Sequence, residues 1–546
     1  WCKSNFLKCN VMRKINLYCV IIISLISVSC SDFLDRNPYG VPSENIFYKN
    51  KEQATYAVNS CYSMLRNLNG FWATGVLIYG NLCSDDCTQD GAINAAYVRG
   101  AFDPGDNYLV TGSFVNAYKG IARCNEGIIN ISNMTDDLID ITDKNQLLGQ
   151  MRFIRAFWYY HLVRLYGAVP LLLEPVDLNN EALLYPSRSS IEEIYEQAII
   201  PDFTFAAENL PASYDSEDKP RITSGAARAY LSAAYLLIKD YANAIKEGEE
   251  VVKLANEGVY ELVEDMESLY METNEFNKES ILEVAFNREI QNWKTRYFGS
   301  LDGGICRGEI YPSTHFNPTL DLINSFSLID GNSIENDLNG YYNESEFWKN
   351  RDPRFNISFY TPLDTYSHKS TGDLVTYSMD WVLNKNGGGV DFQKNTLWYG
   401  DNETNVGLNN VLMRYAEVLL NLAEAYVQTN DLKTAEKYIN QVRTRARNYA
   451  ISHADIYIPK GLTSDKVLPN VTILNQEDGM EKIRYERRVE FAGENIRGYD
   501  LRRWNIEKDT WAKVQGFIWD DKMKLLPIPS SEMSNNPNLR PQNPGY

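Results

Sequence analysis

Aromatic and acidic side chains gather in one polar stretch near the amino terminus, residues 68–113. This stretch contains Trp72 and Tyr97 together with the adjacent carboxylates Asp85 and Asp86. A pyranose ring presents C–H faces that stack on aromatic rings and a rim of hydroxyl groups that needs polar partners. These four residues are therefore the first candidates for contacts with a sugar.

A second stretch of similar composition, residues 290–411, lies beyond the middle of the chain and contains Trp293 and Tyr311. Because aromatic rings are buried more often than they are presented, choosing these two among many rings rests on chemistry and loop position alone. Irregular stretches of this length are uncommon unless they are functional. We expect both stretches to be loops that form a ligand-binding part.

A catalytic interpretation of the same carboxylates is weak. Asp85 and Asp86 could be the two carboxyl groups of a glycosidase, which must lie roughly 5–10 Å apart across the scissile bond. Adjacent residues in a loop tend to point apart, and no second acidic motif accompanies them. The sequence also lacks G-x-S-x-G, H-E-x-x-H, G-x-x-x-x-G-K-[ST] and G-x-G-x-x-G motifs. We therefore predict a binding protein with no catalytic residues.

No metal or cofactor site is predicted. The chain has only four histidines, and they are scattered. The acidic loops could hold a structural calcium ion, but no D-x-D-x-D-G spacing is present. Five cysteines follow Cys30, among which Cys83 and Cys87 could close a small loop, and none has zinc spacing. We interpret these five cysteines as structural.

A dense group of arginines lies in residues 486–504, interleaved with acidic and aromatic residues. Such a cluster could bind an anion. Since Glu486, Glu490, Glu494 and Asp500 lie in the same segment, internal ion pairs and stacking of arginine on aromatic rings explain it without a ligand. The segment Trp348–Phe355 is interpreted in the same way, as a turn fixed by proline and an internal ion pair.

Overall charge excludes some classes of partner. The chain has 546 residues and a formal net charge of −19. Nucleic acids and anionic membrane surfaces both favour clustered Lys and Arg, so neither is expected as a partner. Apolar content of 44% and charged content of 23% fit a folded globular protein.

The amino terminus has the layout of an export signal. A basic start at Met12 is followed by the apolar run Leu17–Val28, which is too short to span a bilayer. Small residues then precede Cys30, as in the cleavage site of a bacterial lipoprotein, whose cysteine becomes lipidated. We predict that residues 1–29 are upstream residues and signal peptide, and that acyl chains on Cys30 anchor the mature chain.

One internal repeat is visible at a spacing of 191 residues. The stretch Ala234–Ala244 matches Ala425–Ala435, including the paired positions of alanine, tyrosine and aspartate. Each copy predicts an apolar helix, a short polar turn and a second helix that begins near alanine. Small residues let antiparallel helices approach closely, so each copy resembles a tetratricopeptide helix pair.

Looser copies extend this pattern. Met151–Tyr166 has apolar residues at helical spacing, with Gly167 as a stop before an extended segment. A further pair is plausible at residues 51–67 and 114–131. The five prolines of Leu525–Tyr546 predict an extended tail on the surface.

Six segments together resemble one known family. They are Arg152–Leu172, Asn324–Gly331, Trp348–Phe355, Arg414–Tyr426, Glu486–Trp504 and Leu525–Tyr546. In this order, and with the lipoprotein signal, they are similar to the hallmark segments of the SusD/RagB family of Bacteroidota outer-membrane lipoproteins.

The resemblance implies a mostly α-helical single domain, with about four tetratricopeptide-like helix pairs as scaffold and a more irregular part that binds ligand without catalysis. It implies a cell-surface lid on a SusC-like, TonB-dependent outer-membrane barrel, which captures oligosaccharides for import. A peptide-capturing subunit and a mainly structural or gating lid remain alternatives. The expected boundaries are residues 30–290 for an N-terminal part and 291–546 for a C-terminal part. Ligand residues of this family lie outside its hallmark segments, so none is transferred by matching.

Overall fold

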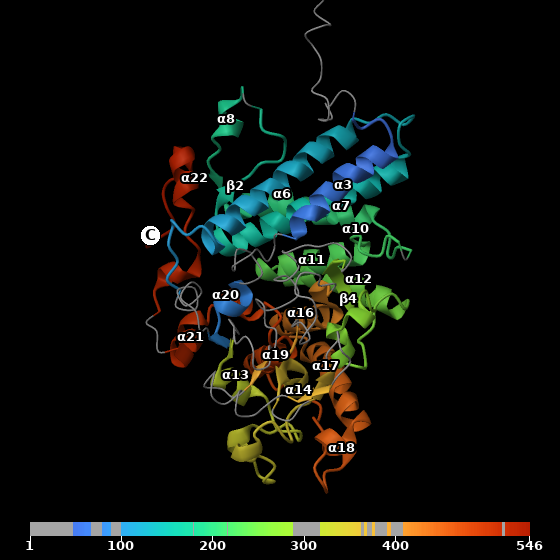
Figure 1. Cartoon of the computed structure of the whole chain (residues 1–546), viewed down its shortest axis with the longest axis vertical. Helices are drawn as coiled ribbons and strands as arrows, with labels where there is room; N and C mark the ends of the chain where they lie inside the picture. Colours follow the sequence, from blue (N-terminus) through green and yellow to red (C-terminus); the bar gives the residue numbers. More distant parts are fainter. Residues whose placement is uncertain are drawn as a thin grey trace, which may run out of the picture.

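The computed structural model describes residues 47–66, 79–88, 100–177, 179–215, 217–287, 317–361, 365–367, 374–376, 390–394, 408–515 and 519–546. Helices dominate this part of the chain, as predicted (Figure 1). The long ones are α3 (Lys51–Leu65), α6 (Leu109–Ser132), α7 (Ile141–Tyr166), α10 (Ile200–Asn209), α11 (Ser224–Leu237), α12 (Tyr241–Asn256), α16 (Tyr415–Gln428), α17 (Leu432–Ser452), α19 (Gln476–Glu490), α20 (Arg497–Trp504) and α21 (Glu507–Gln515).

Eight of these helices form four pairs, which confirms the predicted scaffold. The pairs are α3 with α6, α7 with α10, α11 with α12, and α16 with α17. Each pair packs on the next through α6 and α7, α10 and α11, and α12 and α16. Figure 1 shows the array descending from α3, α6 and α7 to α16, α17 and α19. Within the described residues, none of the helices is long and apolar enough to cross a membrane.

The repeat at 191 residues is confirmed in atomic detail. Lys239 and Asn430, at the matching turns, have φ of 64° and 63°. The next residue, Asp240 or Asp431, accepts a hydrogen bond through its side chain from the backbone N–H three residues on. Both copies thus combine a left-handed turn with an aspartate N-cap, which fixes the angle at which the second helix starts.

The other predicted pairs needed new boundaries. The helix predicted at 114–131 begins at Leu109, so the last residues of the expected loop 68–113 are helical. Met151–Tyr166 is the second half of α7, which ends at Gly167 with φ of 73°. From Leu147 to Tyr166, every residue of α7 except Arg152 and Arg164 is buried, because neighbouring helices cover it on several sides.

The remaining elements are short. The helices are α4 (Tyr79–Leu82), α8 (Glu181–Leu184), α9 (Ile191–Ile194), α13 (Leu320–Ser325), α14 (Arg354–Ser358), α18 (Ala454–Tyr457) and α22 (Ser530–Asn535). The strands pair antiparallel as β1 (Cys87–Thr88) with β5 (Asn317–Pro318), β2 (Val169–Pro170) with β3 (Arg188–Ser189), β4 (Ser280–Val284) with β10 (Asn410–Arg414), β6 (Phe359–Tyr360) with β9 (Asp391–Phe392), and β7 (Thr365–Ser367) with β8 (Leu374–Thr376). In its described parts, the insertion 290–411 therefore consists of short elements, close to the predicted loop.

Two local predictions are corrected. The tail is not wholly extended, because it includes α22, although Leu526 N–H donates to the Leu165 carbonyl at 2.7 Å and holds the extended part against α7. The four cysteines in the described residues are buried thiols, so no disulfide joins Cys83 to Cys87 there.

A buried network of ion pairs ties α19 to distant segments, as the composition of residues 486–504 predicted. Glu490 accepts hydrogen bonds from Arg414 at 3.1 Å and from Arg445 at 2.5 Å, and Arg354 donates to Glu486 at 2.5 Å. All five side chains are at most 4% exposed. The full set of charges is Arg354, Lys394, Arg414, Arg443 and Arg445 against Glu279, Asp352, Glu486, Glu490 and Glu494.

The arginines decide the ionisation of Glu490. Burial opposes its charge, yet Arg445, Arg414 and Arg354 outweigh burial and hold the pKa of Glu490 well below its ordinary range. Because the folded-state pKa is depressed, this carboxylate stabilises the fold above its unfolded pKa, near 4.5. Its contribution is lost as pH falls below that value.

Glu490→Gln is expected to lower the free energy of unfolding by about 3–5 kcal/mol at pH 7, because it leaves buried arginines without their counter-charge. The measurement is urea unfolding followed by circular dichroism. The matched control is Glu481→Gln on the exposed face of the same helix, which should stay within about 0.5 kcal/mol of wild type. Equal stability of the two variants would contradict a structural role for the network.

Candidate functional site

The two stretches predicted to bind ligand are tied together at β1 and β5. Cys87 pairs with Pro318 and Thr88 with Asn317. Thr319 closes this junction, since its backbone N–H donates to the Asp86 carbonyl at 3.0 Å and its hydroxyl donates to the Asp85 carbonyl at 2.7 Å. In sequence, residues 89–99 follow β1 directly and residues 288–316 lead directly into β5. The ladder therefore joins a point inside the first predicted binding stretch to a point inside the second.

Two arginines form ion pairs with the carboxylates at this junction. Arg497 binds Asp85 in a bidentate manner, with Nε and Nη2 each 2.8 Å from a carboxylate oxygen. Arg488 lies 2.8 Å from Asp86, 3.1 Å from Asp85 and 2.7 Å from Asp321. Asp85 is 0% and Asp86 2% exposed, so their charges are met entirely inside the protein. We name Asp85, Asp86, Asp321, Arg488 and Arg497 the loop anchor.

The pKa values of the two neighbouring carboxyl groups diverge. Burial opposes ionisation of Asp85, but Arg488 and Arg497 outweigh it and lower the pKa of Asp85 to about 2. Burial raises the pKa of Asp86 to about 6, against the attraction of Arg488 and with help from the charge on Asp85. One carboxylate of the anchor is thus firmly charged, while the other gains a proton in mildly acidic solution.

Close backbone contact completes the anchor. The Asn81 side chain donates to Asn495 Oδ1 at 2.8 Å and accepts from Asn495 N–H at 3.0 Å. A Cβ atom at Gly80 would come within 1.7 Å of the Asn495 carbonyl oxygen, and one at Gly498 within 2.7 Å of the Cys83 carbonyl oxygen. Only glycine lets α4 approach α20 this closely.

The structure gives these outcomes for the predicted site residues. Asp85 and Asp86 lie together, and the expectation that they point apart is wrong, because both carboxylates turn to Arg488. As placed, both are committed to ion pairs and neither is exposed, which assigns them to support of the loops. The other predicted residues lie outside the described residues: Cys30, Trp72, Tyr97, Trp293 and Tyr311.

The described segments that precede the two stretches also meet, at a cavity of about 320 Å³. One wall is the end of α3, with Tyr62 and Arg66, immediately before residues 67–78. Another wall is the end of β4 near Val284, shortly before residues 288–316. Arg221, from the turn between α10 and α11, lines the same space. Its volume falls in the range of about 300–1,000 Å³ typical of ligand pockets. We name this space the α3 cavity.

Sequence reasoning missed Tyr62, Arg66 and Arg221. The available signal was position, since Arg66 is the next-to-last residue of the helix predicted at 51–67, just before the aromatic stretch. The contribution of Arg221 and of β4 comes from residues more than 150 positions away, and no local pattern shows it.

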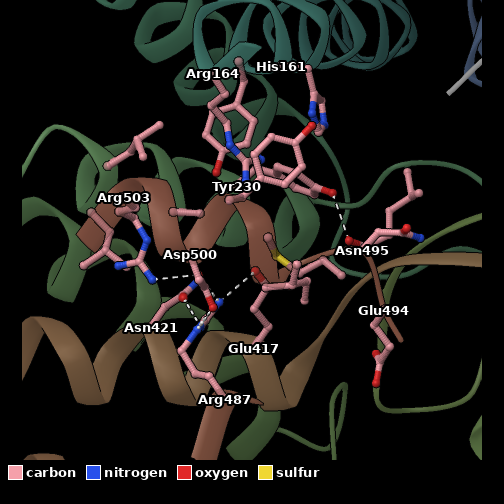
Figure 2. A pocket seen from close by; sticks show the side chains of 18 of the residues that line it. His161, Arg164, Tyr230, Glu417, Asn421, Arg487, Glu494, Asn495, Asp500 and Arg503 are labelled. Atoms are coloured by element: carbon pink, nitrogen blue, oxygen red, sulfur yellow. Dashed lines mark hydrogen bonds and ion pairs between the residues drawn. The ribbon is translucent and has the colours of Figure 1, made fainter. Parts of the chain in front are cut away.

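A second cavity, shown in Figure 2, lies in the interior between α7, α11, α16 and α20. Its volume is about 60 Å³, room for about two water molecules and too little for an oligosaccharide. Charged side chains line it in pairs, among them Arg487 with Asp500 at 2.6 Å and Arg503 with Asp500 at 2.9 Å. Burial, with the nearby Arg164, keeps the pKa of His161 well below its ordinary value. This cavity is structural.

Two larger grooves, of about 460 Å³ beside α6 and about 520 Å³ along α17, are lined by residues outside both predicted binding stretches. Among the described residues, no three His, Cys, Asp or Glu side chains gather as metal ligands would. The α3 cavity is also lined by residues outside both stretches, but some of them, such as Arg66 and Val284, lie just before each stretch in the sequence.

Comparison with known proteins decides the family. Residues 278–546 match the model of the SusD family, and residues 32–236 match a model described as starch-binding associating with outer membrane. The chain belongs to the SusD/RagB family. Its fold and the family resemblance inferred from six sequence segments are thereby confirmed.

Similar SusD-like proteins span nearly the whole chain. SusD-like protein P2 of Formosa agariphila is 29% identical and covers 96% of this chain and 98% of its own length. A crystal structure of a SusD-like protein of Bacteroides fragilis is 27% identical, with a TM-score of 0.76 over 94% of this chain and 100% of that chain. A laminarin-binding SusD-like protein shares the fold at 21% identity and a TM-score of 0.67, over 91% of this chain and 100% of that chain.

Asp85→Asn is expected to destabilise this SusD-family protein by about 3 kcal/mol at pH 7, because Arg497 loses its bidentate partner in a buried position. The matched control is Asp321→Asn, which removes a carboxylate that also binds Arg488 but whose side chain is 51% exposed. That change should cost less than about 1 kcal/mol. Denaturant midpoints measure both, and a larger effect of Asp321→Asn would contradict the assignment of the anchor.

Asp86→Asn should alter how stability depends on pH. The folded-state pKa of Asp86, about 6, lies above its ordinary value of 3.8, so its proton stabilises the fold fully below pH 4. This contribution is lost as pH rises through 6. Asparagine stays neutral, so the variant should gain about 1 kcal/mol relative to wild type between pH 5 and pH 7. Thermal melting at both pH values measures the difference, and a constant difference would show that Asp86 does not titrate there.

Proposed function

We propose that this protein is a cell-surface glycan-binding lipoprotein that captures oligosaccharides and delivers them to a SusC-like, TonB-dependent transporter in the outer membrane. The observation that carries the proposal is the pairing of the two aromatic stretches. Described residues shortly before each stretch line the α3 cavity, and points inside the two stretches pair at β1 and β5. A ligand-binding part assembled from two distant stretches needs such fixed points.

The positions of the predicted aromatic residues suit this arrangement. Trp72 follows Arg66 by six residues, and Trp293 follows the last described residue of the β4 segment, Asn287, by six. Tyr97 precedes Gly100 by three residues, where the described chain resumes. We propose that these rings stack on the C–H faces of sugar rings and that polar side chains near them bind hydroxyl groups.

The loop anchor supports binding without touching the ligand. A shallow, polar site gains little net free energy, so any ordering of loops during binding reduces affinity. Because Asp85 and Asp86 are locked to Arg497 and Arg488, the base of the first stretch is ordered before the ligand arrives. The relatives described as a laminarin-binding SusD-like protein and as surface glycan-binding protein A of Bacteroides fluxus support a glycan as the ligand.

Localisation and partner are part of the proposal. The signal-like segment before Cys30 supports a lipid anchor in the outer membrane, and the second family model supports membrane association. Delivery to a barrel and the absence of catalysis are inferred from the family resemblance. Residues 1–29 would be removed when Cys30 is acylated.

The test is isothermal titration of the mature chain with Cys30→Ser, which prevents acylation. The ligands are plant and host oligosaccharides, neutral and acidic, and a peptide digest, and each mixture is checked afterwards for cleavage. We expect saturable binding to one glycan class with no products. Binding only to peptides would favour the peptide-capturing alternative, and silence from a folded protein would favour a structural or gating lid.

Trp72→Ala and Tyr97→Ala are each expected to weaken binding of that glycan about tenfold or more, since each removes a stacking platform worth roughly 1–2 kcal/mol. Tyr56→Ala is the matched control, because Tyr56 is an aromatic residue of α3 that is 55% exposed. It should leave the affinity unchanged. A loss of affinity in the control alone would place the site elsewhere on the protein.

A further inference from the structure

The α3 cavity contains an arginine whose side chain forms no ion pair with the described residues. Arg66 is the residue that follows α3, and it lines the cavity. Its Nε is buried and finds no hydrogen-bond acceptor in the described part of the chain. A buried donor without an acceptor is costly and needs an explanation, such as a ligand that binds there. Nε is unpaired in the same way in Arg152, Arg351, Arg445, Arg484 and Arg502. Each of these forms an ion pair, hydrogen bond or ring contact through the rest of its side chain, and Arg66 forms none with the described residues.

A second guanidinium faces the same space with its position fixed. Arg221 donates through Nε to Asp218 at 2.6 Å and through Nη1 to Gln150 at 3.1 Å and Asn59 at 3.3 Å. Its Nη2 makes no hydrogen bond within the described residues. The protein side chains thus orient the Arg221 guanidinium and leave one edge of it unused.

The acidic residues of the cavity do not cancel these charges. Glu283 is buried, and its two oxygens already accept from Phe276 N–H at 2.9 Å and from Asn409 Nδ2 at 2.8 Å. Burial also raises the pKa of Glu283, which favours its neutral form. Asp218 is bound to Arg221, and Glu217 is exposed to solvent, where water screens it. What remains available inside is the positive charge of Arg66 and the open edge of Arg221.

We propose that the α3 cavity binds the anionic group of an acidic saccharide, a carboxylate or a sulfate ester, through Arg66 with Arg221. This inference rests on the proposed glycan-binding function and narrows its ligand to an acidic class. A planar guanidinium matches the paired oxygens of a carboxylate or sulfate and binds them with charge-assisted hydrogen bonds. The sugar ring would then lie beside Tyr62.

The test uses pairs of oligosaccharides that differ only in charge. Three carboxylated ligands are titrated, each beside its carboxyl-reduced form: oligomers of galacturonate, of alginate and of glucuronoxylan. Sulfated galactan oligomers are titrated beside their desulfated forms. The protein is the mature chain with Cys30→Ser. We expect at least one acidic member to bind about tenfold or more tighter than its neutral partner, with the preference shrinking as salt is raised.

Arg66→Gln should abolish the preference for the acidic member over its neutral partner. Arg540→Gln is the matched control, since Arg540 is exposed on the C-terminal tail, and it should bind like wild type. Arg66→Lys keeps the charge without the planar fork and should retain part of the preference. It also provides the same comparison if Arg66→Gln folds poorly.

The outcomes separate this inference from the broader function. Equal or tighter binding of the neutral members would overturn the acidic ligand and leave the glycan-binding function standing. An undiminished preference in Arg66→Gln would overturn the assignment to this cavity. Failure of every acidic and neutral saccharide to bind the folded protein would overturn both proposals.

Discussion

The fold depends on the buried charges of one helix, α19. Its last turns present Glu486, Arg487, Arg488 and Glu490 to four different parts of the molecule. Burying these charges costs roughly several kcal/mol of desolvation free energy per ion, and only pairing with opposite charges and hydrogen bonds offsets that cost. Apolar packing would accept several registers of α19 against α16 and α17, whereas a lattice of paired charges accepts one. The ion pairs therefore contribute mainly to specificity, which a scaffold made of similar helix pairs needs, because one pair could replace another in the stack.

The same helix connects the scaffold to the ligand-binding part. In the sequence of α19, Arg488 lies between Glu486 and Glu490, which both belong to the internal network, so the loop anchor and the network share one rigid element. Movement of α19 would disturb both at once. The fixed points of a binding surface then belong to the most tightly determined region of the protein. This explains how one long insertion is tolerated inside the pair of α3 and α6 and another between α12 and α16.

Sequence reasoning succeeded where the determinant is local. The turns at Lys239 and Asn430, each followed by a capping aspartate, were visible as a repeat, and Gly167 was visible as a helix stop. Internal ion pairs around residues 486–504 were predicted by type, but their partners were not, because Arg354 and Glu486 are 132 residues apart. The prediction that Asp85 and Asp86 point apart was wrong for the same reason. Arg488, which lies 402 residues beyond Asp86, binds both carboxylates. The α3 cavity could not be predicted, because three separated segments enclose it.

The contrast between paired and unpaired arginines bears on how ligand recognition could diversify on this scaffold. Some guanidinium groups stabilise the fold, as in Arg354, Arg414 and Arg497, where carboxylate oxygens accept their hydrogen bonds. Replacing one of them leaves buried carboxylates without a counter-charge. Arg66 lies at the end of a helix without such partners among the described residues, so its replacement disturbs no network there. Positions of this kind can change with the ligand while the scaffold stays the same. Ligand preference is therefore expected to reside in residues that border the two insertions, and stability in the residues that anchor them.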